Sequence, residues 1–150
     1  IESLPDKNQI KLSIMRPKGT KELPCVIYYH GGGMSRFSCF FNNFQTLGRL
    51  IASQELIVIM PDFRNCVTPS QEGAEIAKFP GGLNDCVSTV HWVHANSKKL
   101  NSSGNIFLAG ESGGGNLTIA TALSLKKSGN GNLIKGFYAL CPYLAGKFPN

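Results

Sequence analysis

The spacing of apolar and polar positions divides the chain into stretches typical of strands and stretches typical of helices, which follow one another in turn. The pattern predicts strands over 9–15, 25–29, 56–60, 105–110 and 134–144, and helices over 40–54, 81–100 and 113–127. The run 25–29 is continuously apolar, which is typical of a strand covered on both faces, whereas 9–15 alternates as a half-exposed edge-region strand does. Asn84 and Asp85 are candidate caps at the start of the helix over 81–100.

Strands that alternate with helices at this spacing predict right-handed crossovers and a mainly parallel sheet. We therefore expect an α/β fold with helices on both faces of that sheet. Residues 62–80 show no clear period and contain Pro69, Gly73 and Pro80, so they are interpreted as a long loop. The phenylalanines at 37, 40, 41 and 44 predict a core cluster, with a pocket wall as the alternative for some of them.

Composition and charge narrow the possible classes of partner. The chain has 150 residues, of which 42% are hydrophobic and 16% charged, as in globular proteins. Its formal net charge is +6, but the basic residues are scattered, with pairs such as Lys98-Lys99 and Lys126-Lys127. We interpret these as solvated helix ends, and we expect no nucleic-acid partner. No apolar run reaches 18 residues, so we expect no membrane span.

The cysteines and histidines give no metal-binding pattern. Five cysteines (Cys25, Cys39, Cys66, Cys86 and Cys141) include no C-x-x-C pair, and three lie in or beside apolar stretches. Buried free thiols fit a reducing compartment, so we expect a cytoplasmic protein. His91 and His94 share a helix face, but no third ligand accompanies them. We expect no metal site.

Two glycine-rich motifs each follow a predicted strand. Gly110-Glu111-Ser112-Gly113-Gly114 has the G-x-S-x-G spacing that forces a tight strand-to-helix turn and exposes the serine hydroxyl. His30-Gly31-Gly32-Gly33 is a loop whose backbone N–H groups can bind an oxyanion. Together, in this order, the motifs predict an acyl-transfer hydrolase.

Roles follow for the individual residues of these motifs. Ser112 is the expected nucleophile, with Gly32, Gly33 and Gly113 donating N–H groups to the oxyanion and Gly31 giving the loop its flexibility. The alternatives are a helix-capping serine and a simple glycine turn. His30 and Glu111 are expected to support the loop.

A catalytic acid before the serine is a further alternative. Asp62, with Arg64 two residues later, could be taken for that acid, but it lies before the serine in the chain.

The sequence after the serine lacks the partners that such a nucleophile needs. From Gly113 to Asn150 there is no Asp, Glu or His, whereas α/β-hydrolases place nucleophile, acid and base in that order. A complete domain of this type has roughly 250–300 residues. We therefore expect residues 1–150 to be the N-terminal part of one domain, completed by a C-terminal segment that carries the acid and the base.

Four separated blocks of this sequence resemble one known family. The segments 30–34 (HGGGM), 61–65 (PDFRN), 79–86 (FPGGLNDC) and 110–117 (GESGGGNL) are similar to the hormone-sensitive-lipase family of α/β-hydrolases, over roughly residues 22–145. The resemblance implies a carboxylic-ester hydrolase that acts on a small-molecule ester, with Ser112 as nucleophile and no cofactor. It also implies that Asp62 is an internal polar tie rather than the catalytic acid.

Two other functions remain open at this level. A small-molecule receptor on the same fold is one, since plant gibberellin receptors resemble this family without hydrolysing esters. An independent, truncated binding module is the other. Such a module would leave a sheet edge uncovered and would dimerise or aggregate.

Overall fold

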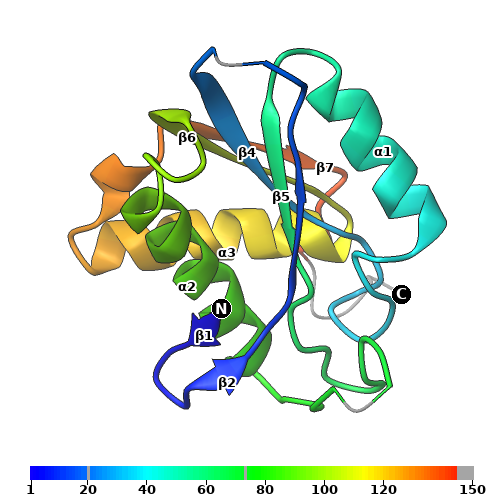
Figure 1. Ribbon diagram of the computed structural model, residues 1–150. Coiled ribbons are helices and arrows are strands. Elements are labelled where there is room, and N and C mark those ends of the chain that lie inside the picture. Colours follow the sequence, from blue (N-terminus) through cyan, green and yellow to red (C-terminus); the bar gives the residue numbers. More distant parts are fainter. Residues whose placement is uncertain (20, 73, 145–150) are drawn as a thin grey trace.

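A mainly parallel five-stranded sheet forms the centre of the protein. The computed structural model describes residues 1–19, 21–72 and 74–144 (Figure 1). The strands of this sheet lie in the order β3 (Leu12–Met15), β5 (Ile57–Pro61), β4 (Leu23–Tyr29), β6 (Ser102–Glu111) and β7 (Gly136–Leu140). Only β3 is antiparallel to its neighbour, whereas β5, β4, β6 and β7 run parallel. A separate two-stranded sheet pairs β1 (Glu2–Ser3) with β2 (Asn8–Gln9).

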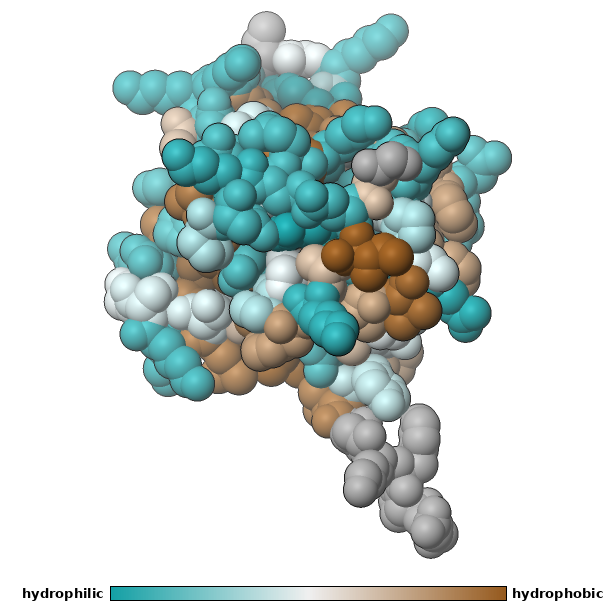
Figure 2. Space-filling view, turned by 90° about the horizontal axis from the view of Figure 1, so that it is seen from below, coloured by the Kyte–Doolittle hydropathy of each residue, from teal (hydrophilic) through white to brown (hydrophobic). Residues whose placement is uncertain are grey.

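Helices cover both faces of the sheet, as predicted. In Figure 1, α1 (Asn42–Ala52) lies on one side, and α2 (Gly81–Ala95) and α3 (Gly113–Lys127) lie on the other. A short 3₁₀ helix, η1 (Gly131–Leu133), follows α3. The fold is thus the expected α/β arrangement. The face shown in Figure 2 is mostly hydrophilic, with a smaller hydrophobic area.

The buried strand β5 shows how the sequence forms these two layers. All five of its residues are buried, which requires apolar side chains in both directions. Ile57 and Ile59 pack in the cluster that faces α2 and α3, whereas Val58 and Met60 pack in the cluster that faces α1. The period of two along the strand therefore supplies one core to each face.

The two edges of the sheet differ in their exposure. Strand β3 forms one edge and continues into a turn, as the alternation over 9–15 predicted. Strand β7 forms the other edge, where Phe137, Tyr138 and Leu140 are 54%, 65% and 47% exposed. Few isolated domains leave so much apolar surface on an edge strand.

Element ends and caps differ from prediction in several places. Strand β3 begins at Leu12 rather than at Gln9, which lies in β2, and β6 begins at Ser102 rather than at Asn105. Helix α2 ends at Ala95 rather than at Leu100, and Leu100 packs against the core from the turn that follows. The helix begins at Gly81 after Pro80, so the expectation that Asn84 or Asp85 caps it is wrong. Strand β7 covers only Gly136–Leu140 of the stretch predicted over 134–144.

The phenylalanine cluster is mostly not core. Phe44 is buried on α1, but Phe37, Phe40 and Phe41 are 38%, 41% and 47% exposed. Phe37 contacts Phe41 and Phe44 with ring centroids 5.8 and 6.4 Å apart. The core expectation is therefore wrong for three of the four rings, which project from the loop and helix start beyond β4.

Candidate active site

Parallel register places the two glycine motifs side by side. Strands β4 and β6 are neighbours, and Tyr29 lies opposite Gly110. Because both strands run in the same direction, the chain that leaves each of them emerges at the same edge of the sheet. The loop that begins at His30 and the turn at Ser112 are therefore adjacent.

Ser112 is exposed on a strained turn between β6 and α3. Its backbone has φ 51° and ψ −117°, a conformation that a non-glycine residue adopts only when its surroundings hold it there. Those surroundings include the last residue of β7 and the segment just after it. The Ser112 N–H donates to Leu140 O at 3.0 Å, and its carbonyl accepts from the Tyr143 N–H at 3.0 Å.

The first turn of α3 packs directly on the ends of the strand and loop. A Cβ atom placed on Gly113 would lie 2.7 Å from the backbone N of Gly33, and one on Gly114 would collide with Tyr29 O. Only glycine at these positions lets the helix start approach so closely. The N-terminus of α3, where N–H groups have no intrahelical partner, is thus set against the glycine loop.

The glycine loop itself is a tight turn. Gly32 has φ 120° and Gly33 has φ 63°, and the carbonyl of Gly32 accepts bonds from both the N–H and the hydroxyl of Ser35. The first glycine of the loop lies against Glu111, since a Cβ on Gly31 would come 3.2 Å from Glu111 Oε1. The loop is therefore fixed from one side by its own hydrogen bonds and from the other by β6.

His30 is enclosed at the base of this loop. Its side chain is 1% exposed and stacks on Phe63, with ring centroids 4.3 Å apart, while Phe44 packs at 5.1 Å. Nδ1–H donates to Gly31 O at 2.7 Å, because the carbonyl can only accept. Burial lowers the pKa of His30, so the ring is neutral and holds the loop.

Asp62 is a structural tie, as the family resemblance implied. Its Oδ1 accepts from the Ser38 hydroxyl at 2.6 Å and from the Cys39 N–H at 3.1 Å. Its Oδ2 accepts from Ser70 at 2.8 Å and from Gln71. The carboxylate thus joins the segment after the glycine loop to the long loop.

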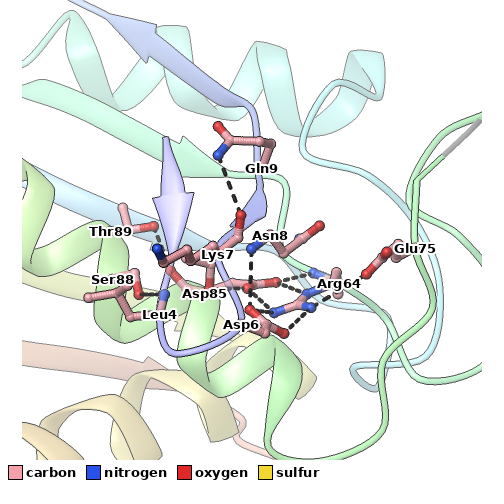
Figure 3. Close-up of polar contacts among 11 residues, drawn as sticks. Leu4, Asp6, Lys7, Asn8, Gln9, Arg64, Glu75, Asp85, Ser88 and Thr89 are labelled. Carbon is pink, nitrogen blue, oxygen red and sulfur yellow. Dashed lines mark hydrogen bonds and ion pairs between the residues drawn. The ribbon is translucent and has the colours of Figure 1, made fainter.

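The Arg64 ion-pair cluster was missed by the sequence analysis (Figure 3). Arg64 bonds Asp85 through Nε at 3.0 Å and Nη2 at 2.7 Å, and its Nη1 bonds Asp6 at 2.6 Å. Glu75 lies 3.7 Å from Nη1. Hydrogen bonds to Asp85 and Asp6 raise the pKa of Arg64, and Arg64 in turn lowers the pKa of Asp6. The cluster links the β1–β2 hairpin, the long loop and α2.

An apolar cavity of about 260 Å³ opens beside the glycine loop. Its walls come from that loop, the long loop, the start of α2 and the first two turns of α3. They comprise Gly33, Met34, Phe63, Arg64, Cys66, Ala77, Phe79, Gly82, Leu83, Asn116, Leu117 and Ala120. The phenylalanines proposed as alternative pocket walls, at 37, 40, 41 and 44, do not line it. No local sequence pattern marks this cavity, because four separate segments enclose it.

The remaining candidate groups lie elsewhere. His91 and His94 are exposed on α2, and among the described residues no group of three His, Cys, Asp or Glu side chains is placed to hold a metal ion. Cys25, Cys39 and Cys86 are buried free thiols, whereas Cys66 and Cys141 are exposed. In the part of the chain that the structure describes, no helix has the length and apolar composition of a membrane span.

Comparison with protein-family models shows which protein family the chain belongs to. The model described as the alpha/beta hydrolase fold matches residues 26–149. The chain belongs to this family. The match includes both glycine motifs and all four parallel strands except the first residues of β4.

Solved structures of esterases are similar to this α/β-hydrolase chain. It superimposes on esterase Est22 with a TM-score of 0.96 and 49% identity, covering 100% of this chain and 44% of that one. Brefeldin A esterase, a bacterial homologue of human hormone sensitive lipase, gives a TM-score of 0.88 and 39% identity, covering 97% and 39%. The resemblance to the hormone-sensitive-lipase family is confirmed.

Curated relatives include both enzymes and a receptor. Probable carboxylesterase 7 of Arabidopsis thaliana is 29% identical over 158 residues, which cover 97% of this chain and 48% of that protein. The gibberellin receptor GID1A of the same plant is 28% identical over 122 residues, which cover 79% and 33%. The chain spans less than half the length of these relatives.

Proposed function

We propose that this chain carries the nucleophile and the oxyanion hole of a serine carboxylic-ester hydrolase. The observation that carries the proposal is the contact between Gly113 and Gly33 beside the exposed, strained Ser112. It sets the N–H groups of a loop and of a helix start next to one hydroxyl. That is the arrangement an acyl-transfer reaction needs, because negative charge develops on the substrate's carbonyl oxygen one bond from the attacked carbon.

In the proposed reaction, Ser112 Oγ attacks the ester carbonyl carbon and its proton passes to a histidine base. The carbonyl oxygen becomes an oxyanion, which accepts hydrogen bonds from Gly32, Gly33 and Gly113, with Gly31 shaping the loop. Collapse of this intermediate breaks the bond to the alcohol, which leaves with the proton from the histidine. Water then hydrolyses the acyl-enzyme by the same steps, and no cofactor takes part.

The base and its carboxylate partner are assigned to a C-terminal segment of the same domain. His30, the histidine next to the loop, is buried between two rings and bonded to Gly31, so it is a supporting residue. Residues 113–150 contain no acid or histidine. Strand β7 lies at the edge of the sheet, where its backbone N–H and C=O groups can pair with a further strand, and its apolar side chains are exposed.

Substitution of Ser112 tests this function in the complete protein that carries the chain. Ser112→Ala is expected to lower kcat for a short-chain p-nitrophenyl ester by about 10⁶-fold. It should also abolish labelling by a fluorophosphonate. Ser103→Ala, at an exposed serine near the start of β6, is the matched control and should change neither quantity. Labelling of another residue, or full activity in Ser112→Ala, would contradict the assignment.

A small-molecule receptor is the second candidate, favoured by the similarity to GID1A. Such a protein keeps the fold and the serine while lacking the histidine base. The residue at the base position of the C-terminal segment distinguishes the two. A receptor would bind its ligand reversibly and would show no turnover with any ester.

A further inference from the structure

The glycine loop continues into two strained residues that are not glycine. After Gly32 and Gly33, the backbone of Met34 has φ 60° and that of Phe37 has φ 80°. A non-glycine residue keeps such a conformation only where its surroundings hold it there. The position of the whole turn therefore depends on contacts from outside it.

The first part of the long loop supplies these contacts. The Cys66 N–H donates to Met34 O at 2.9 Å. The Asn65 side-chain N–H donates to Phe37 O at 2.8 Å. The carbonyl of each strained residue is thus held by one of two consecutive residues of the long loop.

Among these contacts, the one from Asn65 depends on its side chain. Cys66 donates through its backbone, and Thr68 donates to Ser35 O through its backbone N–H at 2.9 Å as well as through its hydroxyl at 3.1 Å. Any residue except proline can make a backbone bond of this kind. The bond from Asn65, a residue that is 0% exposed, instead requires a side chain that carries a donor.

The Asn65 amide is bonded at one end only. Its nitrogen faces Phe37 O, because a carbonyl oxygen can only accept a hydrogen bond. Its Oδ1 is buried, and none of the residues that the structure describes donates to it. A buried acceptor without a partner costs free energy, so an apolar side chain of similar size would be tolerated here with little loss of stability. The value of the amide therefore lies in what its donor holds.

Phe37 connects this bond to the proposed oxyanion donors. A Cβ atom on Gly32 would lie 2.9 Å from Phe37 Cδ2 and would collide with Arg36 O, so Gly32 rests directly on this part of the turn. Asn65 is itself fixed, since its carbonyl accepts from the Ala77 N–H at 2.9 Å. A displacement of Phe37 O from Asn65 would therefore move Gly32 as well.

We propose that Asn65 is a positioning residue for the oxyanion hole, because its side-chain N–H holds Phe37 O and thereby sets the direction of the Gly32 N–H. The inference rests on the proposed esterase function. The Gly32 N–H acts most strongly in the transition state, when negative charge develops on the carbonyl oxygen of the substrate. Loss of the Asn65 donor should therefore lower kcat and leave KM nearly unchanged.

The test measures steady-state kinetics of the complete protein with a short-chain p-nitrophenyl ester. Asn65→Leu removes the donor at similar size, and Asn65→Ala is a second variant without a donor. Each should lower kcat by about 10²-fold, because misplacement of a catalytic group by roughly 1 Å has an effect of that size. KM should stay within about twofold. The urea midpoint of Asn65→Leu should change little.

Inhibition by a trifluoromethyl ketone gives a readout that a purely structural role would not move. Ser112 Oγ adds to the ketone carbon, the electron pair of the C=O bond becomes an oxyanion, and the hydroxyl proton passes to the base. The Ki of this inhibitor should rise in Asn65→Leu by the factor by which kcat/KM falls. Asn96→Leu is the matched control, since it loses a side-chain N–H bond of 2.9 Å to Trp92 O at the end of α2, and it should change neither kcat nor Ki.

Four outcomes would overturn the proposal. Unchanged kcat and Ki in both Asn65 variants would reject it and leave the esterase function intact. A lower urea midpoint at constant kcat would assign Asn65 a structural role alone, and a higher KM at constant kcat would place it in substrate binding. Absence of ester hydrolysis in the unsubstituted protein would reject the proposed function, and this inference with it.

Discussion

Arg64 and Asp85 form a buried, bidentate ion pair, in which Nε lies 3.0 Å from Oδ2 and Nη2 lies 2.7 Å from Oδ1. The two side chains are 5% and 0% exposed. The Arg64 backbone N–H and the Ser3 hydroxyl also donate to the same carboxylate. Both oxygens of the Asp85 carboxylate therefore accept hydrogen bonds from the long loop, and one of them also accepts from the N-terminal hairpin. These bonds fix α2 relative to both segments.

Removal of one partner should be costly because the other charge stays buried. Arg64→Met is expected to lower the free energy of unfolding by about 3–5 kcal/mol. Lys21→Met is the matched control, since Lys21 pairs with Glu55 at 2.8 Å on the surface, where such pairs contribute about 0–1 kcal/mol. Urea unfolding measures both. Equal losses for the two variants would show that burial does not govern the Arg64 pair.

This ion pair is also an example of a contact that could not be predicted from the sequence. Asp85 near the start of a predicted helix has the local pattern of a cap, and only the fold reveals that its partner lies 21 residues earlier. The buried strand β5, by contrast, was predictable from five consecutive apolar residues. Helix α3 was predicted over 113–127, where the structure has it, because glycines mark both of its ends locally.

Part of the candidate site was likewise predictable from the sequence, and part was not. Ser112 and the glycine loop were found from short motifs, since backbone strain and close approach restrict the residue types at each position. The cavity beside them was not found, because its walls at Met34, Phe79 and Ala120 meet only through tertiary contacts. The exposed rings at 37, 40 and 41 were misplaced for a related reason: an apolar side chain in a loop carries no period that indicates its direction.

Because Gly113 lies against the glycine loop, we expect its substitution to affect kcat more strongly than the unfolding midpoint. Gly113→Ala places a methyl group 2.7 Å from Gly33 N, so the loop must move away from the helix start. Displacement of oxyanion donors lowers kcat by about 10²–10³-fold. Steady-state kinetics with a short-chain ester, alongside the unfolding midpoint, measures the effect.

The control for Gly113 is Gly131→Ala. A Cβ at Gly131 would contact Lys126 at an ordinary 3.5 Å, so this variant should keep its kcat. If Gly113→Ala retained full kcat, the two glycines would not form the oxyanion hole.

Burial of His30 predicts that stability falls on mild acidification. Desolvation lowers the pKa of His30 in the folded protein below its ordinary value of 6.5. The unfolded chain therefore takes up this proton first as the pH falls. The contribution to stability is complete above about pH 6.5 and is lost as the pH falls from there toward the folded-state pKa. Asp6, whose pKa is lowered from 3.8, affects the pH dependence of stability only at lower pH.

Urea unfolding between pH 7.5 and pH 5 measures this dependence. His30→Gln, which cannot take up a proton, should be less stable at pH 7.5 but should show a flatter profile above pH 5. His91→Gln, at an exposed position on α2, should keep the slope of the unsubstituted protein. An unchanged slope in His30→Gln would mean that another group binds the proton on unfolding.

The open edge at β7 gives a test of the proposed domain completion. Tyr138 is 65% exposed in this chain, and a substitution at such a surface position ordinarily changes stability by no more than about 0.5 kcal/mol. If a following segment pairs with β7 in the complete protein, Tyr138 is covered there and Tyr138→Lys buries a charge. The free energy of unfolding should then fall by about 2–4 kcal/mol. Leu50→Lys, at a residue of α1 that is 63% exposed, is the control, and an equally small effect at both positions would show that nothing covers β7.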